Sequence, residues 1–157
     1  MKILICGLPG SGKSTLAEPF CKLINGVWLN ADKIRTLYDD WDFTPEGRMR
    51  QAQRMRHIAD GVVMAGRIAV ADFVCPTSAA RAAFAADYTV FMDTLKASKS
   101  TKEAAPGTTF ADTDRMFEPV QNCNYHVGSW FNDTHAELTK VVNNYMLAQQ
   151  GKPTERL

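Results

Sequence analysis

The stretch Gly7-Leu8-Pro9-Gly10-Ser11-Gly12-Lys13-Ser14-Thr15 decides the fold of this chain. It satisfies the phosphate-loop pattern G-x-x-x-x-G-K-[ST] at every fixed position. Its glycines let the backbone form a nest of inward-pointing N–H groups, and a helix beginning at the end of the loop turns its positive dipole end toward the same anion. Lys13 adds a point charge for the β and γ phosphates, and the Ser14 hydroxyl is suited to ligating Mg²⁺.

The residues on either side of the loop support a phosphate-binding role. Residues 2–6 form a short apolar run that ends directly at Gly7, as a buried parallel strand does, and residues 16–24 are typical of a helix. The alternative is a glycine-rich turn with an incidental lysine, which would need neither the strand nor the helix. We therefore expect an ATP site built from Gly7, Pro9, Gly10, Ser11, Gly12, Lys13, Ser14 and Thr15.

Length and composition limit the classes of protein to which the chain can belong. Its 157 residues suffice for one domain, which we expect to span 1–157. The formal net charge of +1 predicts neither a nucleic acid nor a membrane as partner. The four cysteines are widely spaced without a C-x-x-C motif, so we expect no zinc site, no disulfide framework and a reducing, cytoplasmic location. We expect no signal peptide, because the first strand starts beside Met1.

Strand-like and helix-like segments alternate along the rest of the chain. Thr44 and Pro45 are typical of a helix start, and Thr134-x-x-Glu137 predicts a capping box at the start of the last helix. The alternation predicts an α/β, three-layer fold, in which helices cover both faces of a five-stranded parallel sheet. Together with the phosphate loop, this arrangement resembles the P-loop NTPase/kinase fold. The further strands are expected at 27–30, 68–74, 88–92 and 124–127, and the further helices at 45–66, 78–86 and 134–150.

Residues 95–123 differ from the rest, since they are polar and punctuated by turn residues. We interpret them as a lid or substrate flap, the alternative being a plain surface loop. Such a flap would bring one cation over the phosphates, and the candidates are Lys99, Lys102 and Arg115.

Two aspartates follow or end predicted strands. In an open α/β sheet, ligands bind outside the carboxyl ends of the strands, so Asp32 is well placed for chemistry; alternatively, it caps the next short helix. Asp72 lies near the end of an apolar strand, where a lone buried carboxylate is costly unless it is paired or near a metal. We expect Ser14 to ligate Mg²⁺, and Asp32 and Asp72 to be candidates for holding it through water. For Asp72, a hydrogen-bonded structural acid is the alternative.

The helix that begins at Pro45 carries several arginines. For most of them we prefer a solvated basic face. Arg48 is the exception, because it lies in the first turn, near the active-site edge.

The motifs along the chain resemble those of the adenylylsulfate kinases, P-loop kinases that transfer the γ-phosphate of ATP to the 3′-hydroxyl of adenosine 5′-phosphosulfate. The family's G-L-[SP]-G-S-G-K-S-T-L-A matches residues 7–17, and its D-G-D-N-V-R is similar to residues 30–35. Its G-F-[ST]-x-E-D-R resembles residues 42–48, F-[IV]-[SC]-P resembles the end of 71–76, and V-F-[VM]-D-T matches 90–94. The F-x₃-D-x₂-[YF]-E spacing is met by Phe110, Asp114, Phe117 and Glu118.

This resemblance implies roles for individual residues. Lys13 and Asp32 would be catalytic, with Asp32 accepting or orienting the proton of the substrate hydroxyl near Mg²⁺. Arg35 and Arg48 would hold the phosphosulfate end of a small nucleotide substrate, while Phe43 and Phe110 would sandwich its adenine. For each phenylalanine, core packing is the alternative. The resemblance also allows a homodimer.

The chain departs from the family pattern at several positions. Asn30 and Ala31 replace an acid and a glycine of D-G-D-N-V-R, and the family's R-D-x-K-G-L-Y-x-K lid segment is absent. These departures leave other activities open: a polynucleotide 5′-hydroxyl kinase, whose group also places Asp-x-x-Arg after its second strand, another small-molecule P-loop kinase, or an ATP-binding module without catalysis.

Overall fold

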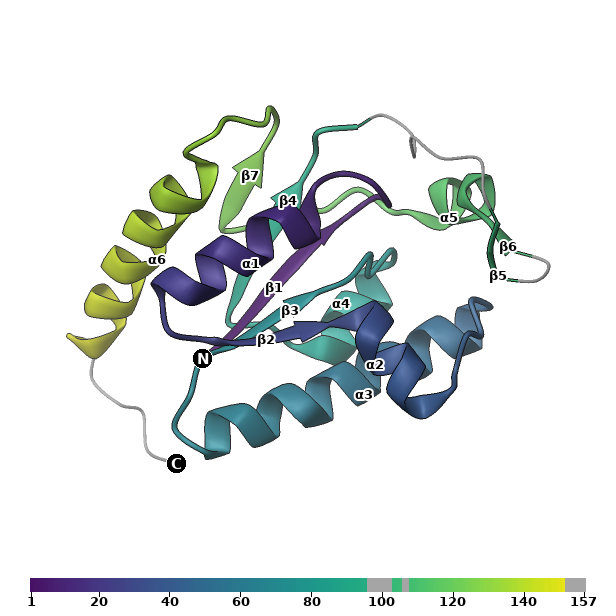
Figure 1. Ribbon diagram of the computed structural model, residues 1–157, viewed down its shortest axis with the longest axis horizontal. Helices are drawn as coiled ribbons and strands as arrows, with labels where there is room; N and C mark the ends of the chain where they lie inside the picture. The colour runs from purple at the N-terminus through teal and green to yellow at the C-terminus, as the bar shows by residue number, and fades with distance from the viewer. Residues whose placement is uncertain (96–102, 106–107, 152–157) are drawn as a thin grey trace.

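The computed structural model describes residues 1–95, 103–105 and 108–151, with side chains described outside 103–105 and 108–112. A five-stranded sheet lies at its centre, in the order β2-β3-β1-β4-β7, and all of its paired strands are parallel (Figure 1). The strands are β1 (Lys2–Gly7), β2 (Val27–Asn30), β3 (Ala69–Asp72), β4 (Tyr88–Met92) and β7 (Tyr125–Val127). The predicted fold class is therefore confirmed.

Helices cover both faces of this sheet (Figure 1). On one face, α1 packs against α6, and on the other, α3 packs against α4. The short helix α2 directly follows β2. The bounds are α1 (Lys13–Leu23), α2 (Ala31–Tyr38), α3 (Pro45–Met64), α4 (Ser78–Phe84) and α6 (Thr134–Gln150).

The two faces of the sheet belong to two hydrophobic clusters, as the period of two in a strand requires. In β1, Ile3 and Ile5 pack with α1 and α6, whereas Leu4 and Cys6 pack with α2, α3 and α4. All four side chains are buried, which explains why the first strand appears as an unbroken apolar run. The central strand β1 leads directly into the phosphate loop and fixes its position at the carboxyl edge of the sheet.

The helix starts show one confirmed and one wrong prediction. Thr44 caps α3, because its Oγ1 accepts a hydrogen bond from Gly47 N at 3.1 Å. The capping box predicted at Thr134 is wrong: Asp133 is the N-cap of α6 and makes no side-chain cap bond. The Thr134 hydroxyl instead donates to Phe131 O at 2.8 Å and accepts from Phe131 N, so it stabilises the preceding turn.

The region predicted as a flap contains short regular elements. The hairpin of β5 (Glu103–Ala105) and β6 (Thr108–Thr109) leads into α5 (Phe110–Met116), and the three lie beyond the end of the main sheet in Figure 1. The candidate cations Lys99 and Lys102 lie outside the described residues. Within the described part of the chain, no helix has the length and apolar character that a bilayer span requires.

Candidate active site

A cavity of about 610 Å³ opens where the phosphate loop meets the ends of β2 and β3. It brings together sequence-predicted residues from four separate segments. Those lining it are Pro9, Gly10, Gly12, Lys13, Ser14, Thr15, Asp32, Arg35, Phe43, Arg48 and Asp72. Gly7 and Ser11, both predicted for ATP binding, are buried and do not line it. Phe110 begins α5, and its side chain lies outside the described ones.

The backbone of the phosphate loop explains its glycines. A Cβ added to Gly7 would lie 2.6 Å from the carbonyl oxygen of Met92 on β4, so only glycine fits there. Gly12 has φ +100° and serves as the N-cap of α1, without a side-chain cap bond. The first N–H groups of α1 are thus left for a ligand, which is the arrangement that binds phosphate. The buried Ser11 hydroxyl likewise has no hydrogen-bond partner within the described residues.

Lys13 is held over the loop from which it comes. Its Nζ donates to the carbonyl oxygen of Leu8 at 3.0 Å. Burial lowers the pKa of Lys13, while the negative charges of Asp72 and, more weakly, Asp32 act in the opposite direction. The side chain is therefore a partly desolvated donor with two carboxylates nearby.

Asp72 is the most tightly bonded carboxylate of the cavity. It is only 3% exposed, and its Oδ2 accepts hydrogen bonds from Ser14 Oγ at 3.0 Å, Trp28 Nε1 at 3.1 Å and Asn30 Nδ2 at 3.1 Å. Sequence reasoning proposed Asp72 but missed Trp28 and Asn30 as its partners. The pairing of β2 with β3 places Asn30 directly beside Asp72, and that contact depends on strand order.

Asp32 reaches the cavity from a helix rather than from a strand end. It is the second residue of α2, is exposed and lines the cavity. The alternative that Asp32 caps this helix is wrong, because Asn30 is the N-cap and its Oδ1 accepts from Lys33 N at 3.1 Å. The Asp32 carboxylate therefore does not cap this helix.

Two buried arginines flank the ring of Phe43. The guanidinium carbon of Arg35 lies 4.3 Å from the ring centroid and that of Arg48 lies 5.1 Å away. Arg35 Nη1 donates to the carbonyl oxygens of Asp40 and Asp42, at 2.9 and 3.3 Å. Arg48 donates to Phe43 O at 3.1 Å and to Thr113 Oγ1 at 2.7 Å.

These two arginines are 4% and 8% exposed, and among the described residues neither has a carboxylate within ion-pair distance. Burial, together with the charge of Arg35, lowers the pKa of Arg48 to about 10. Two desolvated cations that form no ion pair within the described residues are a strong site for an anion, although the charge of Asp40 partly offsets the burial of Arg35.

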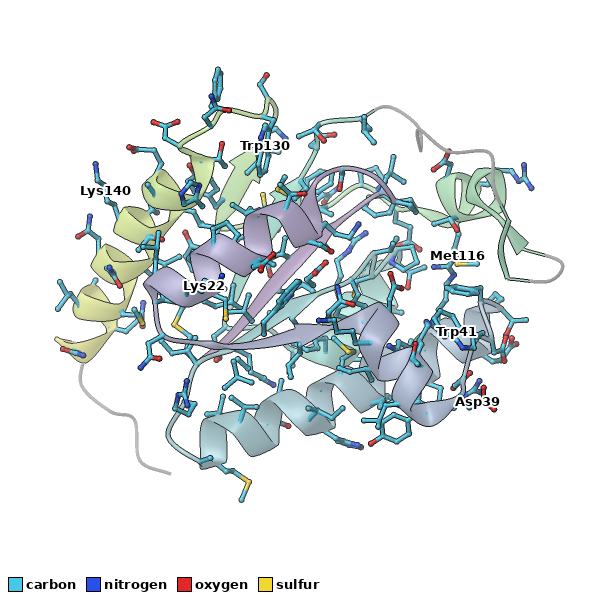
Figure 2. All side chains as sticks on the ribbon, viewed as in Figure 1. Lys22, Asp39, Trp41, Met116, Trp130 and Lys140 are labelled. Atoms are coloured by element: carbon cyan, nitrogen blue, oxygen red, sulfur yellow. The ribbon has the colours of Figure 1, made fainter. Side chains whose placement is uncertain are left out.

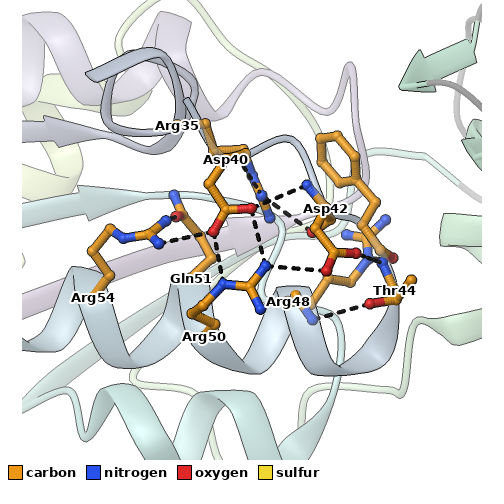
Figure 3. Close-up of polar contacts among 10 residues, drawn as sticks. Arg35, Asp40, Asp42, Thr44, Arg48, Arg50, Gln51 and Arg54 are labelled. Atoms are coloured by element: carbon orange, nitrogen blue, oxygen red, sulfur yellow. Dashed lines mark hydrogen bonds and ion pairs between the residues drawn. The ribbon is translucent and has the colours of Figure 1, made fainter. Parts of the chain in front are cut away.

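An ion-pair network fixes the loop that carries Phe43 (Figure 3). Asp40 accepts from Arg50 Nε at 2.8 Å and from Arg54 Nη2 at 2.8 Å, and Arg50 also reaches Asp42 at 3.0 Å. These hydrogen bonds lower the pKa of Asp40 well below its ordinary value. The prediction of a solvated face is therefore wrong for Arg54, whose side chain is 14% exposed, and incomplete for Arg50.

Several lining residues were not predicted. Trp41 lies in the loop between α2 and α3 (Figure 2), and its ring centroid is 6.4 Å from that of Phe43. Gln51 bridges two elements, since its Nε2 donates to Ala31 O and its Oε1 accepts from Arg54. Cys75 follows β3 with φ +47°, an uncommon value for a non-glycine residue. Of these residues, only Trp41 could have been noticed in the sequence, because a tryptophan surrounded by three aspartates is unusual for a surface loop.

The donor set fits Mg²⁺. The Ser14 hydroxyl and the Asp72 carboxylate offer oxygen atoms beside the phosphate loop, and oxygen is the ligand type that Mg²⁺ prefers. The described residues contain no cluster of three or more His, Cys, Asp or Glu side chains that could cage a metal. All four cysteines are free thiols.

Comparisons with known proteins agree with this geometry. Residues 1–102 match the family model for adenylylsulphate kinase. The chain is 30% identical over 142 residues to the bifunctional enzyme CysN/CysC of Xylella fastidiosa, an alignment that covers 77% of this chain and 23% of that enzyme. The chain thus spans about a quarter of the length of this relative.

Solved structures share the fold. The APS kinase CysC of Mycobacterium tuberculosis, in complex with AMPPNP and APS, superposes with a TM-score of 0.70 at 17% identity, covering 90% of this chain and 96% of that one. A sugar kinase from Janibacter sp. HTCC2649 gives 0.65 at 13% identity, with 98% of both chains covered. The family match extends over more than half of the sequence and includes the phosphate loop, Asp32, both cavity arginines and Asp72. The chain therefore belongs to the adenylylsulphate kinase family.

Proposed function

We propose that this chain transfers the γ-phosphate of ATP to the 3′-hydroxyl of adenosine 5′-phosphosulfate. The observation that carries the proposal is a single cavity with two unlike ends. One end is a phosphate loop, and the other is a pair of buried arginines around an aromatic ring. Asp32 lines the same cavity and, in this proposal, faces the acceptor alcohol.

At the phosphate end, the backbone N–H groups of the loop and Lys13 hold the β and γ phosphates. When bound, Mg²⁺ neutralises the charge that develops on these phosphates. Ser14 would ligate the ion directly, and Asp72 would hold it through water. Because phosphoryl transfer needs alignment and charge neutralisation more than covalent help, this end needs no nucleophile of its own.

At the acceptor end, Arg35 and Arg48 bind the phosphosulfate group, and the Phe43 ring supports the adenine. The two guanidiniums fit a planar bidentate contact with oxyanions better than ammonium groups would. Phe43 is half-buried and lines the cavity, and we propose that the part of its ring that faces the cavity is one side of the sandwich. Phe110 is the proposed second face.

In the transfer step, the acceptor 3′-oxygen attacks the γ-phosphorus in line. A bond forms between that oxygen and phosphorus, the bond to the β–γ bridging oxygen breaks, and ADP leaves. Asp32 accepts or orients the hydroxyl proton. The segment 95–123 acts as a flap that closes over the site, excludes water and brings a cation to the phosphates, because an open site would hydrolyse ATP. We expect the enzyme to work in the cytoplasm, where its thiols stay reduced.

The experiment that tests this function offers the purified protein γ-labelled ATP and Mg²⁺ with one of three additions. These are adenosine 5′-phosphosulfate, a 5′-hydroxyl oligonucleotide, or nothing. We expect label only in the doubly phosphorylated nucleotide product. Label in the oligonucleotide would indicate a polynucleotide kinase, and release of inorganic phosphate with no acceptor dependence would overturn the proposal.

A further inference from the structure

Asn30 and Asp72, at the ends of two neighbouring strands, form a hydrogen-bonded pair of one amide and one carboxylate beside the phosphate loop. β2 ends at Asn30 and β3 ends at Asp72, and the two are register partners in the parallel sheet. Asn30 Nδ2 donates to Asp72 Oδ2 at 3.1 Å, and the same amide nitrogen lies 3.4 Å from Ser14 Oγ. Both side chains therefore border the hydroxyl that we propose as the Mg²⁺ ligand.

The amide of Asn30 performs two tasks at once. Its oxygen caps α2, the helix that carries Asp32, by accepting from Lys33 N. Its nitrogen holds the Asp72 carboxylate. An aspartate at position 30 would keep the cap but would place a second carboxylate oxygen where the donor now lies, against Asp72. Like charges at this distance repel strongly in a buried site.

The sequence also indicates that the carboxylate at this site has changed position. The motif similar to residues 30–35 opens with an acid, and this chain has Asn30 at that place. Asp72 supplies a carboxylate one strand away, at the register partner of the substituted position. Trp28 Nε1 provides a third donor to the same oxygen, so the carboxylate is anchored in a fixed orientation although it is almost fully buried.

We infer that Asn30 and Asp72 form one functional unit, in which Asp72 supplies the strand-end carboxylate that holds Mg²⁺ through water and Asn30 is its positioning residue. The inference rests on the proposed function, because it assigns residues to the Mg²⁺·ATP end of that site. The unit requires one carboxylate and one amide at positions 30 and 72. We expect it to work in either order, so that the negative charge can be moved from the end of β3 to the end of β2.

Four proteins test this unit: the wild type, Asp72→Asn, Asn30→Asp and the exchange variant Asn30→Asp/Asp72→Asn. Calorimetry measures the affinity for ATP with Mg²⁺ and with a chelator, and the ratio of the two affinities gives the Mg²⁺ dependence. We expect Asp72→Asn to lower this ratio about 10-fold without changing the affinity measured with chelator. We expect the exchange variant to recover the ratio to within about three-fold of wild type.

Asn30→Asp alone should lower the melting temperature without Mg²⁺, and added Mg²⁺ should restore part of the loss, because the ion screens the two carboxylates. Asp39→Asn is the matched control, since Asp39 is exposed, does not line the cavity and has a left-handed backbone that asparagine tolerates. It should leave every measurement unchanged.

An exchange variant no better than Asp72→Asn, or an Asp72→Asn variant with the wild-type ratio, overturns the inference. If Asp72→Asn does not fold, the same affinity ratio measured on Asn30→Ser tests the inference. Serine keeps the cap of α2 and removes the amide donor, so the ratio should fall several-fold; an unchanged ratio would contradict the pair. A wild type that binds no ATP at all would instead refute the proposed function, so the two failures are distinguishable.

Discussion

The two ends of the cavity are built in different ways. The phosphate end is a contiguous loop in which we propose that backbone N–H groups and one lysine bind ATP, and its geometry follows from β1, α1 and two glycines. The acceptor end is assembled from side chains of α2, the loop after it, α3 and α5. Carbonyl oxygens and a hydroxyl orient its two arginines, and neither arginine forms an ion pair with a carboxylate in the part of the chain that the structure describes.

If the two ends bind as proposed, we expect this difference to separate the affinity for ATP from the affinity for the acceptor. A backbone nest tolerates changes elsewhere because it depends on local conformation. A pair of buried cations depends on every element that holds it, and here that includes the Asp40 network of Figure 3. Substitutions at the two ends should therefore have separable effects.

The largest effect is expected for Lys13→Ala. Removing the only lysine that lines the cavity among the described residues takes away the charge on the β and γ phosphates, so turnover should fall on the order of 10⁴-fold. Steady-state kinetics with radiolabelled ATP measures this loss. Lys22→Ala, an exposed lysine of the same helix, is the control and should retain wild-type rates.

Asp32→Asn should lower kcat about 10³-fold and leave the affinity for ATP nearly unchanged. The amide keeps the shape of the side chain but cannot take the hydroxyl proton. Single-turnover kinetics and calorimetry together separate the two quantities. A kcat close to that of the wild type would show that Asp32 is not catalytic. A loss of ATP affinity as large as the loss of kcat would show that Asp32 acts at the phosphate end.

Arg48→Lys tests the acceptor end. Lysine keeps the charge but loses the planar fork that contacts Phe43 O and Thr113 Oγ1, so the KM for adenosine 5′-phosphosulfate should rise about 30-fold, on the order of 2 kcal/mol. The KM for ATP should stay within two-fold. Arg56→Lys on the exposed side of α3 is the control. Equal effects on both substrates would show that the two ends are not separable.

Asp40→Asn should have the smallest effect on the reaction. It weakens the bonds to Arg50 and Arg54, so we expect a loss of about 1–2 kcal/mol in the free energy of unfolding at pH 7 and a KM for the acceptor raised a few-fold. The pKa of Asp40 is lower in the folded protein than in the unfolded chain. Its contribution is therefore complete at neutral pH and declines as the pH falls below about 4.

Urea unfolding between pH 7 and pH 3 measures this dependence. The difference in stability between wild type and Asp40→Asn should be largest at neutral pH and shrink in acid. A difference that stays constant across the range would mean that the network does not depend on the ionised carboxylate.

The same contrast explains what the sequence could predict. The phosphate loop, the flanking strand and the helix starting at Pro45 are local patterns, and the structure agrees with them. The bonding of Asp72 to Trp28 and Asn30 depends on β2 lying beside β3, and the role of Arg54 depends on a loop returning to α3. Such contacts between distant residues leave no periodic signal.

The wrong assignments have a common cause. At Thr134, the pattern of a capping box was present, but the hydroxyl was already used by the turn at Phe131. At the start of α2, two residues with capping side chains compete, and Asn30 rather than Asp32 takes the position. One-dimensional patterns identify groups that can form a bond, whereas the surrounding structure decides which of them does.

The most direct test of the central claim is a crystal structure with Mg²⁺, a non-hydrolysable ATP analogue and adenosine 5′-phosphosulfate. We expect the acceptor nucleotide between Arg35, Phe43 and Arg48, with its 3′-oxygen about 2.6–3.2 Å from the Asp32 carboxylate and pointing at the γ-phosphate in the loop. An Asp32 carboxylate turned away from that oxygen, or an acceptor bound outside the cavity, would contradict the account.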